Sequence, residues 1–141
     1  MRLFVDTSAL VKLYYPEPGS QRVEEKILKY RYILISELSV VEFASALMKK
    51  KRQGEINEED RALIWESFQR DLGANNVTVI SLESEEYVVA SKLISDHGGR
   101  GLRTLDSLQL AAATKIEHVD ILTEGAVLSE IAAEMELRVI A

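Results

Sequence analysis

The chain has 141 residues, a length that fits one domain able to bury its own core. Hydrophobic residues make up 47% and charged residues 28%, and the absence of cysteine excludes disulfides, zinc–thiolate centres and a cysteine nucleophile. The net charge of −6, from 23 acidic and 17 basic residues, argues against a protein that binds polyanions over its whole surface, but it fits a site that collects carboxylates.

Short apolar runs alternate with helical segments in the first half of the chain. Residues 2–5 (RLFV) predict a buried strand, and Asp6-Thr7-Ser8 reads as a helix N-cap directly after it. The next elements predicted are helices over residues 9–15 and from 20 to about 30, a strand over 32–35, a helix opened by Ser36 or Ser39 and ending at Arg52, a helix from 58 to about 72, and a strand over 77–80.

The second half continues the same alternation. It predicts a helix over residues 82–95, a glycine loop at 97–101, a helix capped by Thr104 and running through 106–117, a strand at 121–122, a helix over 126–135 and a strand over 137–140. Apolar strands separated by helices are typical of a parallel sheet covered on both faces. We therefore expect a single α/β domain over residues 1–141, a three-layer α/β/α sandwich with about five strands.

Several carboxylates follow the predicted strands. Asp6 comes after the first strand, Glu42 lies in the first turns after the second, Glu124 follows the strand at 121–122, and Asp106 opens the helix after the glycine loop. The carboxyl ends of parallel strands gather at one sheet edge, where α/β proteins bind their ligands. Oxygen ligands of this kind suit Mg²⁺ or Mn²⁺.

Each carboxylate also has a structural interpretation. Asp6 can be a helix cap with no further role, and Glu42 can be a solvated surface glutamate. Asp106 can be a first-turn acid favoured by the helix dipole, although its helix is apolar around most of its circumference and leaves such an acid in need of a partner.

The segments LFVDTSALVKLY, SELSVVEFASAL, LRTLDSLQLAAA and ILTEGAVLSEIAAEMELRVI carry a resemblance that spans essentially the whole chain. In this order and spacing they resemble the PIN-domain ribonucleases, and among them the VapC-type toxins of prokaryotic toxin–antitoxin pairs. The resemblance implies a PIN-like, Rossmann-like fold with Asp6, Glu42 and Asp106 as the catalytic, metal-binding residues. It also implies hydrolysis of RNA phosphodiester bonds with Mg²⁺ or Mn²⁺.

The resemblance fails at Gly125, where the family commonly carries an aspartate after the fourth strand. The adjacent Glu124 is a candidate replacement ligand, and Thr123 stands where the family often has a hydroxyl. Ser8 and Thr123 are the residues expected to orient the ligands. The departure leaves open whether the site holds one metal ion or two.

Arg100 and Arg103 are candidate RNA contacts because they directly precede Asp106. The basic run Lys49–Arg52 is interpreted either as a complement to its helix dipole or as a set of phosphate contacts. The resemblance further implies a homodimer and a small antitoxin partner.

Two other functions are considered. A phosphohydrolase of the haloacid dehalogenase kind needs an aspartate two residues after its nucleophile, and Ser8 stands there instead. A PIN-like protein that has weakened catalysis and serves in binding or assembly stays open because of Gly125.

No apolar run approaches the roughly 18 residues of a membrane helix, and the N-terminal apolar stretch, interrupted by Asp6, is too short for a signal peptide. Together with the lack of cysteine, these features predict a soluble cytoplasmic protein with no membrane contact.

Overall fold

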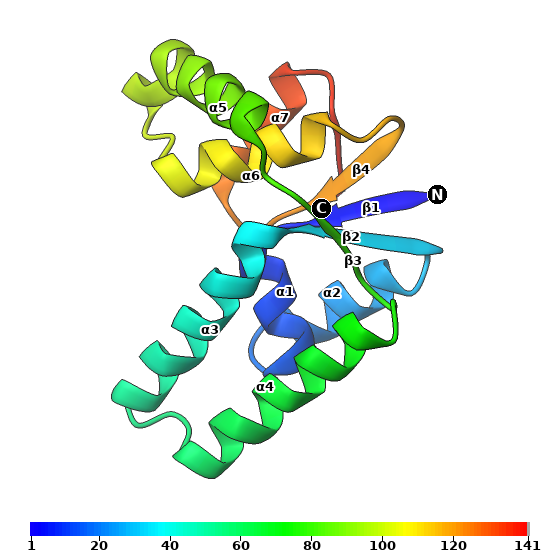
Figure 1. Cartoon of the computed structure of the whole chain (residues 1–141), viewed down its shortest axis with the longest axis vertical. Helices are drawn as coiled ribbons and strands as arrows, with labels where there is room; N and C mark the ends of the chain where they lie inside the picture. The colour runs from blue at the N-terminus through cyan, green and yellow to red at the C-terminus, as the bar shows by residue number, and fades with distance from the viewer. Residues whose placement is uncertain (141) are drawn as a thin grey trace.

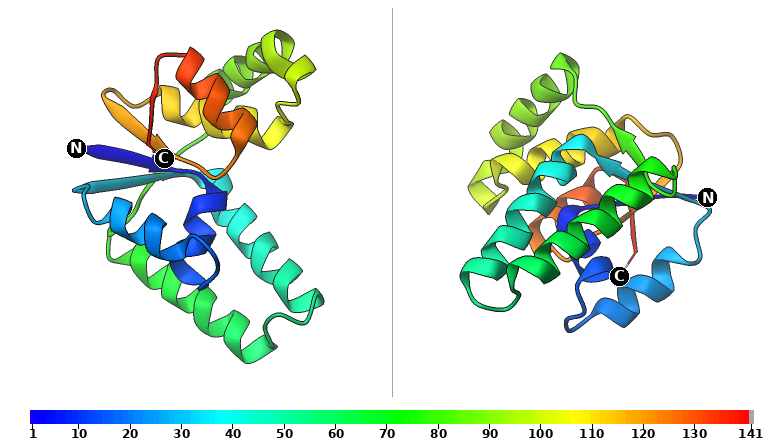
Figure 2. Two further views of the ribbon diagram at one scale, coloured as in Figure 1. Left: turned by 180° about the vertical axis from the view of Figure 1, so that it is seen from behind. Right: turned by 60° about the horizontal axis from the view of Figure 1, so that its bottom comes forward.

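The computed structural model describes residues 1–140, in which five parallel strands form one sheet in the order β3-β2-β1-β4-β5. The strands are Arg2–Val5 (β1), Tyr32–Ser36 (β2), Thr78–Ile80 (β3), Val119–Leu122 (β4) and Arg138–Ile140 (β5). Helices α1 (Thr7–Tyr14), α2 (Ser20–Ile27), α3 (Glu37–Arg52) and α4 (Glu58–Gly73) cover one face, and α5 (Ser84–His97), α6 (Thr104–Thr114) and α7 (Ala126–Glu134) cover the other (Figures 1 and 2). The predicted three-layer α/β sandwich is confirmed.

The central strand β1 separates two hydrophobic cores. Leu3 and Val5, both fully buried, pack in the core between the sheet and α1–α4. Phe4, 1% exposed, packs in the core under α5–α7. Side chains alternate between the two faces of a strand, so a strand covered on both sides is apolar at every position. This is why RLFV reads as a continuous apolar run.

Helix N-caps set where α1 and α3 begin. The Asp6 carboxylate accepts a hydrogen bond from the Ser8 N–H, so α1 starts at Thr7, two residues before the predicted start. The Ser36 hydroxyl accepts from the Leu38 N–H at 3.0 Å, which decides between the two predicted caps in favour of Ser36.

The predictions around α6 are wrong in detail. Thr104 is the first helical residue and not the cap; the N-cap is Arg103, whose side chain makes no capping hydrogen bond. The predicted glycine loop contains a short 3-10 helix over Gly98–Arg100, and Gly101 ends it with a φ of 90°, a conformation that glycine adopts without steric cost. The α6 helix ends at Thr114, three residues earlier than predicted.

The two longest helices, α3 and α4, form a hairpin that extends away from the sheet (Figure 1). Ion pairs lie at its turn: the Lys50 ammonium lies 3.4 Å from a Glu55 oxygen, and that of Lys51 lies 2.8 Å from a Glu58 oxygen. Lys50 also lies 3.1 Å from an oxygen of Glu17, which stands between α1 and α2. No helix within residues 1–140 is long and apolar enough to cross a bilayer.

Candidate active site

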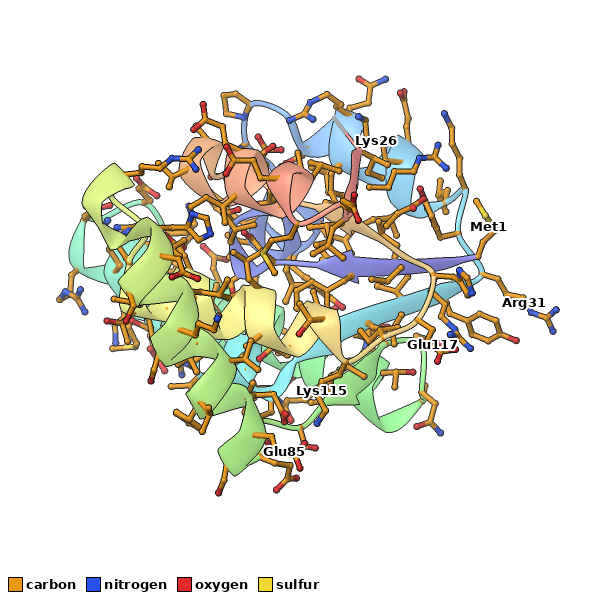
Figure 3. All side chains as sticks on the ribbon, turned by 90° about the horizontal axis from the view of Figure 1, so that it is seen from above. Met1, Lys26, Arg31, Glu85, Lys115 and Glu117 are labelled. Carbon is orange, nitrogen blue, oxygen red and sulfur yellow. The ribbon has the colours of Figure 1, made fainter. Side chains whose placement is uncertain are left out.

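The candidate site lies where β1 and β4 end. Met1, Arg31 and Glu117 mark the opposite edge, at which the strands begin (Figure 3). From β1 the chain enters α1 on one face of the sheet, and from β4 it enters α7 on the other face (Figure 1). In parallel α/β sheets, a crevice between neighbouring strands that continue to opposite faces is the usual ligand site. Asp6 and Thr123 stand directly after these two strands.

Asp6 is held in place by neutral donors. It is 6% exposed, and its Oδ1 accepts from the Ser8 N–H at 2.6 Å and from the Ser8 hydroxyl at 2.5 Å. The Thr123 hydroxyl donates to its Oδ2. Burial raises the pKa of Asp6 above its ordinary value, while the hydrogen bonds from Ser8 and Thr123 act in the opposite direction. No cation within residues 1–140 pairs with this carboxylate. Its negative charge is therefore available to a bound cation.

Glu42 is also oriented by neutral donors. It lies in the second turn of α3, is half-buried, and its Oε1 accepts from the Thr7 hydroxyl and from the Gln109 amide, each at 2.7 Å. The interpretation of Glu42 as a freely solvated surface glutamate is wrong, because its carboxylate is fixed by α1 and α6.

Asp106 lies in the first turn of α6 and is more accessible. Its side chain is 25% exposed, and its Oδ2 lies 3.5 Å from Nε of Arg103, a side chain that is 85% exposed. An ion pair this exposed contributes little free energy and is readily exchanged for another partner.

One cavity of about 140 Å³ brings the three carboxylates together. Its lining residues come from four separate parts of the chain: Asp6, Thr7, Ser8, Glu42, Arg103, Asp106, Gln109 and Gly125. In their present positions, no three acidic or histidine side chains of residues 1–140 converge tightly enough to hold a metal ion. The donor set nevertheless fits Mg²⁺ or Mn²⁺, because it consists of carboxylate oxygens from three elements facing one small cavity. These side chains would have to come closer together to share one ion.

Glu124 is not brought into this cavity. Its backbone N–H donates to the Ser8 hydroxyl at 3.0 Å, while its carboxylate forms an ion pair with Arg22 of α2. Gly125 lines the cavity in its place, with an ordinary φ of −83°. A Cβ at Gly125 would lie 3.4 Å from Oγ1 of Thr123, a tight but tolerable distance. The cavity therefore has three carboxylates, and nothing in the backbone requires glycine at position 125.

The two arginines predicted to contact RNA have different surroundings. Arg103 lines the carboxylate cavity. The Arg100 guanidinium instead lies 2.5 Å from a Glu134 oxygen and 3.4 Å from a Glu130 oxygen, both on α7. Arg100 is therefore occupied by α7, and Arg103 is the better placed of the two.

A larger hollow, of about 640 Å³, adjoins the carboxylate cavity and shares Thr7, Ser8, Glu42 and Arg103 with it. One wall is a face of α3 that carries Ser45, Ala46, Lys49 and Arg52. We call this the basic groove. Within residues 1–140, Lys49 and Arg52 have no carboxylate at ion-pair distance, whereas Lys50 and Lys51 do.

The sequence did not reveal that the basic run divides into two pairs, with Lys50 and Lys51 in ion pairs and Lys49 and Arg52 facing the basic groove. Residues three apart on a helix share a face, so the spacing of Lys49 and Arg52 was the available signal.

Gln109 is a second residue that the sequence analysis missed. It is 3% exposed and stands in α6 between the buried residues Leu108 and Leu110. The signal was a lone amide in an otherwise apolar segment, three residues after Asp106 and so on the same helix face.

Comparison with known proteins places this geometry in context. The PIN domain family profile matches residues 3–134. Ribonuclease VapC3 of Pyrobaculum aerophilum is 32% identical over 73 residues, a segment that covers 49% of this chain and 56% of that relative, so the match spans little more than half of the relative's length.

Solved structures resemble the whole chain in fold. FitAcB from Neisseria gonorrhoeae matches with a TM-score of 0.73 at 14% identity, covering 99% of this chain and 96% of that chain. The structure of VapBC2 from Rickettsia felis bound to a promoter DNA fragment matches with a TM-score of 0.69 at 16% identity, covering 99% of this chain and 98% of that chain. A toxin–antitoxin complex from Klebsiella pneumoniae matches with a TM-score of 0.65 at 17% identity, covering 100% of this chain and 97% of that chain. At these identities the likeness concerns the fold alone.

Proposed function

The chain belongs to the PIN-domain family, and from this premise we propose that it is a divalent-metal-dependent ribonuclease that hydrolyses phosphodiester bonds in RNA. The observation that carries the proposal is the single cavity lined by Asp6, Glu42 and Asp106. The relative named as a ribonuclease supports the choice of RNA as the substrate.

Asp6, Glu42 and Asp106 are the residues that would hold Mg²⁺ or Mn²⁺. When bound, such an ion lowers the pKa of a water molecule and neutralises the scissile phosphate. In the hydrolysis, the water gives up one proton as its oxygen bonds to phosphorus, the bond from phosphorus to one ribose oxygen breaks, and that oxygen takes up a proton.

Neighbouring hydroxyls prepare the carboxylates for this role. Ser8 and Thr123 orient Asp6 by donating to its two oxygens, and Thr7 does the same for Glu42. Because these donors are neutral, they fix the carboxylates without cancelling their charge. Arg103 lies at the rim, where its guanidinium can leave Asp106 and contact an RNA phosphate.

We also propose protein partners: a small antitoxin and a second copy of this chain. The similar folds from Rickettsia felis and Klebsiella pneumoniae are described as a VapBC pair and a toxin–antitoxin complex. Exposed apolar side chains on α3 and α5 support contact with another protein: Val41 is 69% exposed, Tyr87 54% and Val88 70%. We propose that the protein acts on its RNA substrate in the cytoplasm.

A second candidate function is that of a PIN-domain protein with weakened catalysis that serves in binding or assembly. Gly125 and the separation of the carboxylates favour it, because a cavity without a fourth carboxylate holds a second cation poorly. The two functions differ in whether the chain binds a divalent cation.

The test is to incubate structured and single-stranded RNA with the purified protein in Mg²⁺, in Mn²⁺ and in EDTA, beside an Asp6→Asn, Asp106→Asn double variant. We expect cleavage that requires the metal and is absent in the variant. Titration calorimetry with Mn²⁺ accompanies the assay. No cleavage together with no Mn²⁺ binding would reject the ribonuclease and support the binding protein.

A further inference from the structure

We propose that Gln109 is a positioning residue that holds the Glu42 carboxylate in the geometry the metal site needs. The assignment rests on the proposed ribonuclease function and deepens it, because it names the residue that connects the three elements bearing the carboxylates. Gln109 belongs to α6, and its partners belong to α1 and α3.

The contacts of Gln109 converge on its amide nitrogen. Nε2 lies 2.7 Å from Oε1 of Glu42, 2.9 Å from the Ser39 hydroxyl and 3.1 Å from the Thr7 hydroxyl. The Thr7 hydroxyl in turn lies 2.7 Å from the same Glu42 oxygen. Glu42 is thus held by an N–H from α6 and an O–H from α1.

Hydrogen-bond chemistry decides which way the amide faces. The ionised Glu42 carboxylate only accepts hydrogen bonds, whereas the hydroxyls of Thr7 and Ser39 can donate or accept. An amide turned the other way would set its own oxygen against the carboxylate oxygen and repel it. The NH₂ group must therefore face Glu42.

The amide oxygen of Gln109 indicates that this residue does more than fill the hydrophobic core. Oε1 of Gln109 is buried and has no hydrogen-bond partner within residues 1–140. A buried acceptor without a partner destabilises the fold, and an apolar side chain of similar volume would avoid that loss. Gln109 is thus better explained by what its N–H groups hold than by a contribution to stability.

The position of Gln109 links the carboxylates to one another. Residues three apart on a helix share a face, so Gln109 and Asp106 face the same cavity from α6. Thr7, a partner of Gln109, directly follows Asp6. One side chain therefore ties together the segments that carry Asp6, Glu42 and Asp106, and without it Glu42 keeps only the hydrogen bond from Thr7.

The experiment compares the wild-type chain with Gln109→Met, which keeps the volume and removes the donors. Residues that orient metal ligands typically contribute about 10- to 100-fold to metal affinity or activity. We expect a loss of this size in Mn²⁺ affinity by calorimetry and in kcat on RNA, with KM little changed. The thermal midpoint in EDTA should stay the same or rise. If Gln109 only supported the core, the thermal midpoint would fall while Mn²⁺ affinity and kcat stayed close to those of the wild type.

Three control variants sharpen the result. Ser39→Ala removes another partner of Gln109 but leaves its bond to Glu42, and should bind Mn²⁺ like the wild type. In a Glu42→Gln background, Gln109→Met should cause no further loss, because the carboxylate that it positions is gone. A second apolar variant, Gln109→Leu, guards against a folding failure peculiar to methionine.

The outcomes are separable. Wild-type affinity and kcat in Gln109→Met, or unfolding of both apolar variants, would overturn the positioning role and leave the ribonuclease standing. Failure of the wild-type chain to bind Mn²⁺ and to cleave RNA would remove the proposed function, and with it this inference.

Discussion

At the turn between α3 and α4, Glu55 and Glu58 each lie against a lysine. At the strand ends, by contrast, the partners of Asp6 and Glu42 among residues 1–140 are all hydroxyl, amide and backbone N–H donors. Both regions hold their carboxylates in defined positions, but only the hairpin turn neutralises them. Keeping a carboxylate charged and buried without a cation is costly. The difference supports the proposal that the strand-end cavity receives a cation from solution.

The largest effect is expected when the charge itself is removed from the cavity. Asp6→Asn should lower kcat/KM by at least about 100-fold, since a bound metal contributes several kcal/mol of transition-state stabilisation. The fold should survive in EDTA, because an asparagine oxygen still accepts from Ser8 and the Thr123 hydroxyl can reverse to accept. Kinetics and thermal melting measure the two effects. A collapse of the melting point would mean that Asp6 matters mainly as the cap of α1.

Adding charge to the cavity is the converse change. Gly125→Asp places a fourth carboxylate in a position whose φ suits any residue, at the N-cap of α7 where aspartate is favoured. We expect Mn²⁺ to bind roughly tenfold more tightly, since affinity rises with the number of charged ligands. Calorimetry of this variant and of Gly125→Asn, which can cap α7 without adding charge, separates the effect of the added charge from the effect of the cap. Equal affinities in both variants would contradict the expectation.

The basic run of α3 allows a matched comparison between the two regions. A Lys49→Ala, Arg52→Ala double variant removes the two α3 cations from the basic groove and leaves Arg103. We expect RNA affinity to fall severalfold and the slope of log K against log salt to drop by about 1 to 2. Lys50→Ala, Lys51→Ala removes the same charge from the hairpin turn. It should leave RNA affinity nearly unchanged at equal ionic strength. Equal losses in both pairs would mean that only net charge matters.

The smallest effect belongs to the hairpin turn. Hydrogen bonds from Arg61 and Lys51 lower the pKa of Glu58 from 4.5 to about 2. A lowered folded-state pKa means that the pair contributes stability above about pH 4.5, and that this contribution is lost as the pH falls toward 2. Urea unfolding of the wild type and Glu58→Gln should differ slightly at neutral pH and converge in acid. Since Glu58 is exposed, high salt should also remove the difference.

The fold was predictable because its signals are local. Each strand is a short apolar run, and caps such as Ser36 and Asn57 mark where helices begin. The positions of Asp6, Glu42 and Asp106 near the ends or starts of these elements followed from the same patterns. Parallel strands sharing an edge account for Asp6 and Glu42 meeting at one cavity, whereas Asp106 reaches it through the packing of α6, which follows α5 and the 3-10 helix.

The contacts that decide which side chains face the cavity could not be predicted in this way. Glu124 turns to Arg22, 102 residues away in the chain, and Arg100 turns to the acids of α7. Gln109 finds its partners on two other helices. Such pairings depend on how the elements pack, and no spacing within a segment encodes them.

The strand order has a consequence for how the protein is made. Asp6 follows β1, yet its Thr123 partner follows β4, and the Asp6 N–H donates to Leu122 O at 3.1 Å. Synthesis from the N-terminus therefore produces Asp6 before its Thr123 partner, which lies 117 positions later in the chain. Contacts this distant in sequence form late in folding. The nascent chain therefore lacks the complete surroundings of Asp6 until Thr123 has emerged from the ribosome, so a producing cell would meet the proposed activity only after that point of synthesis.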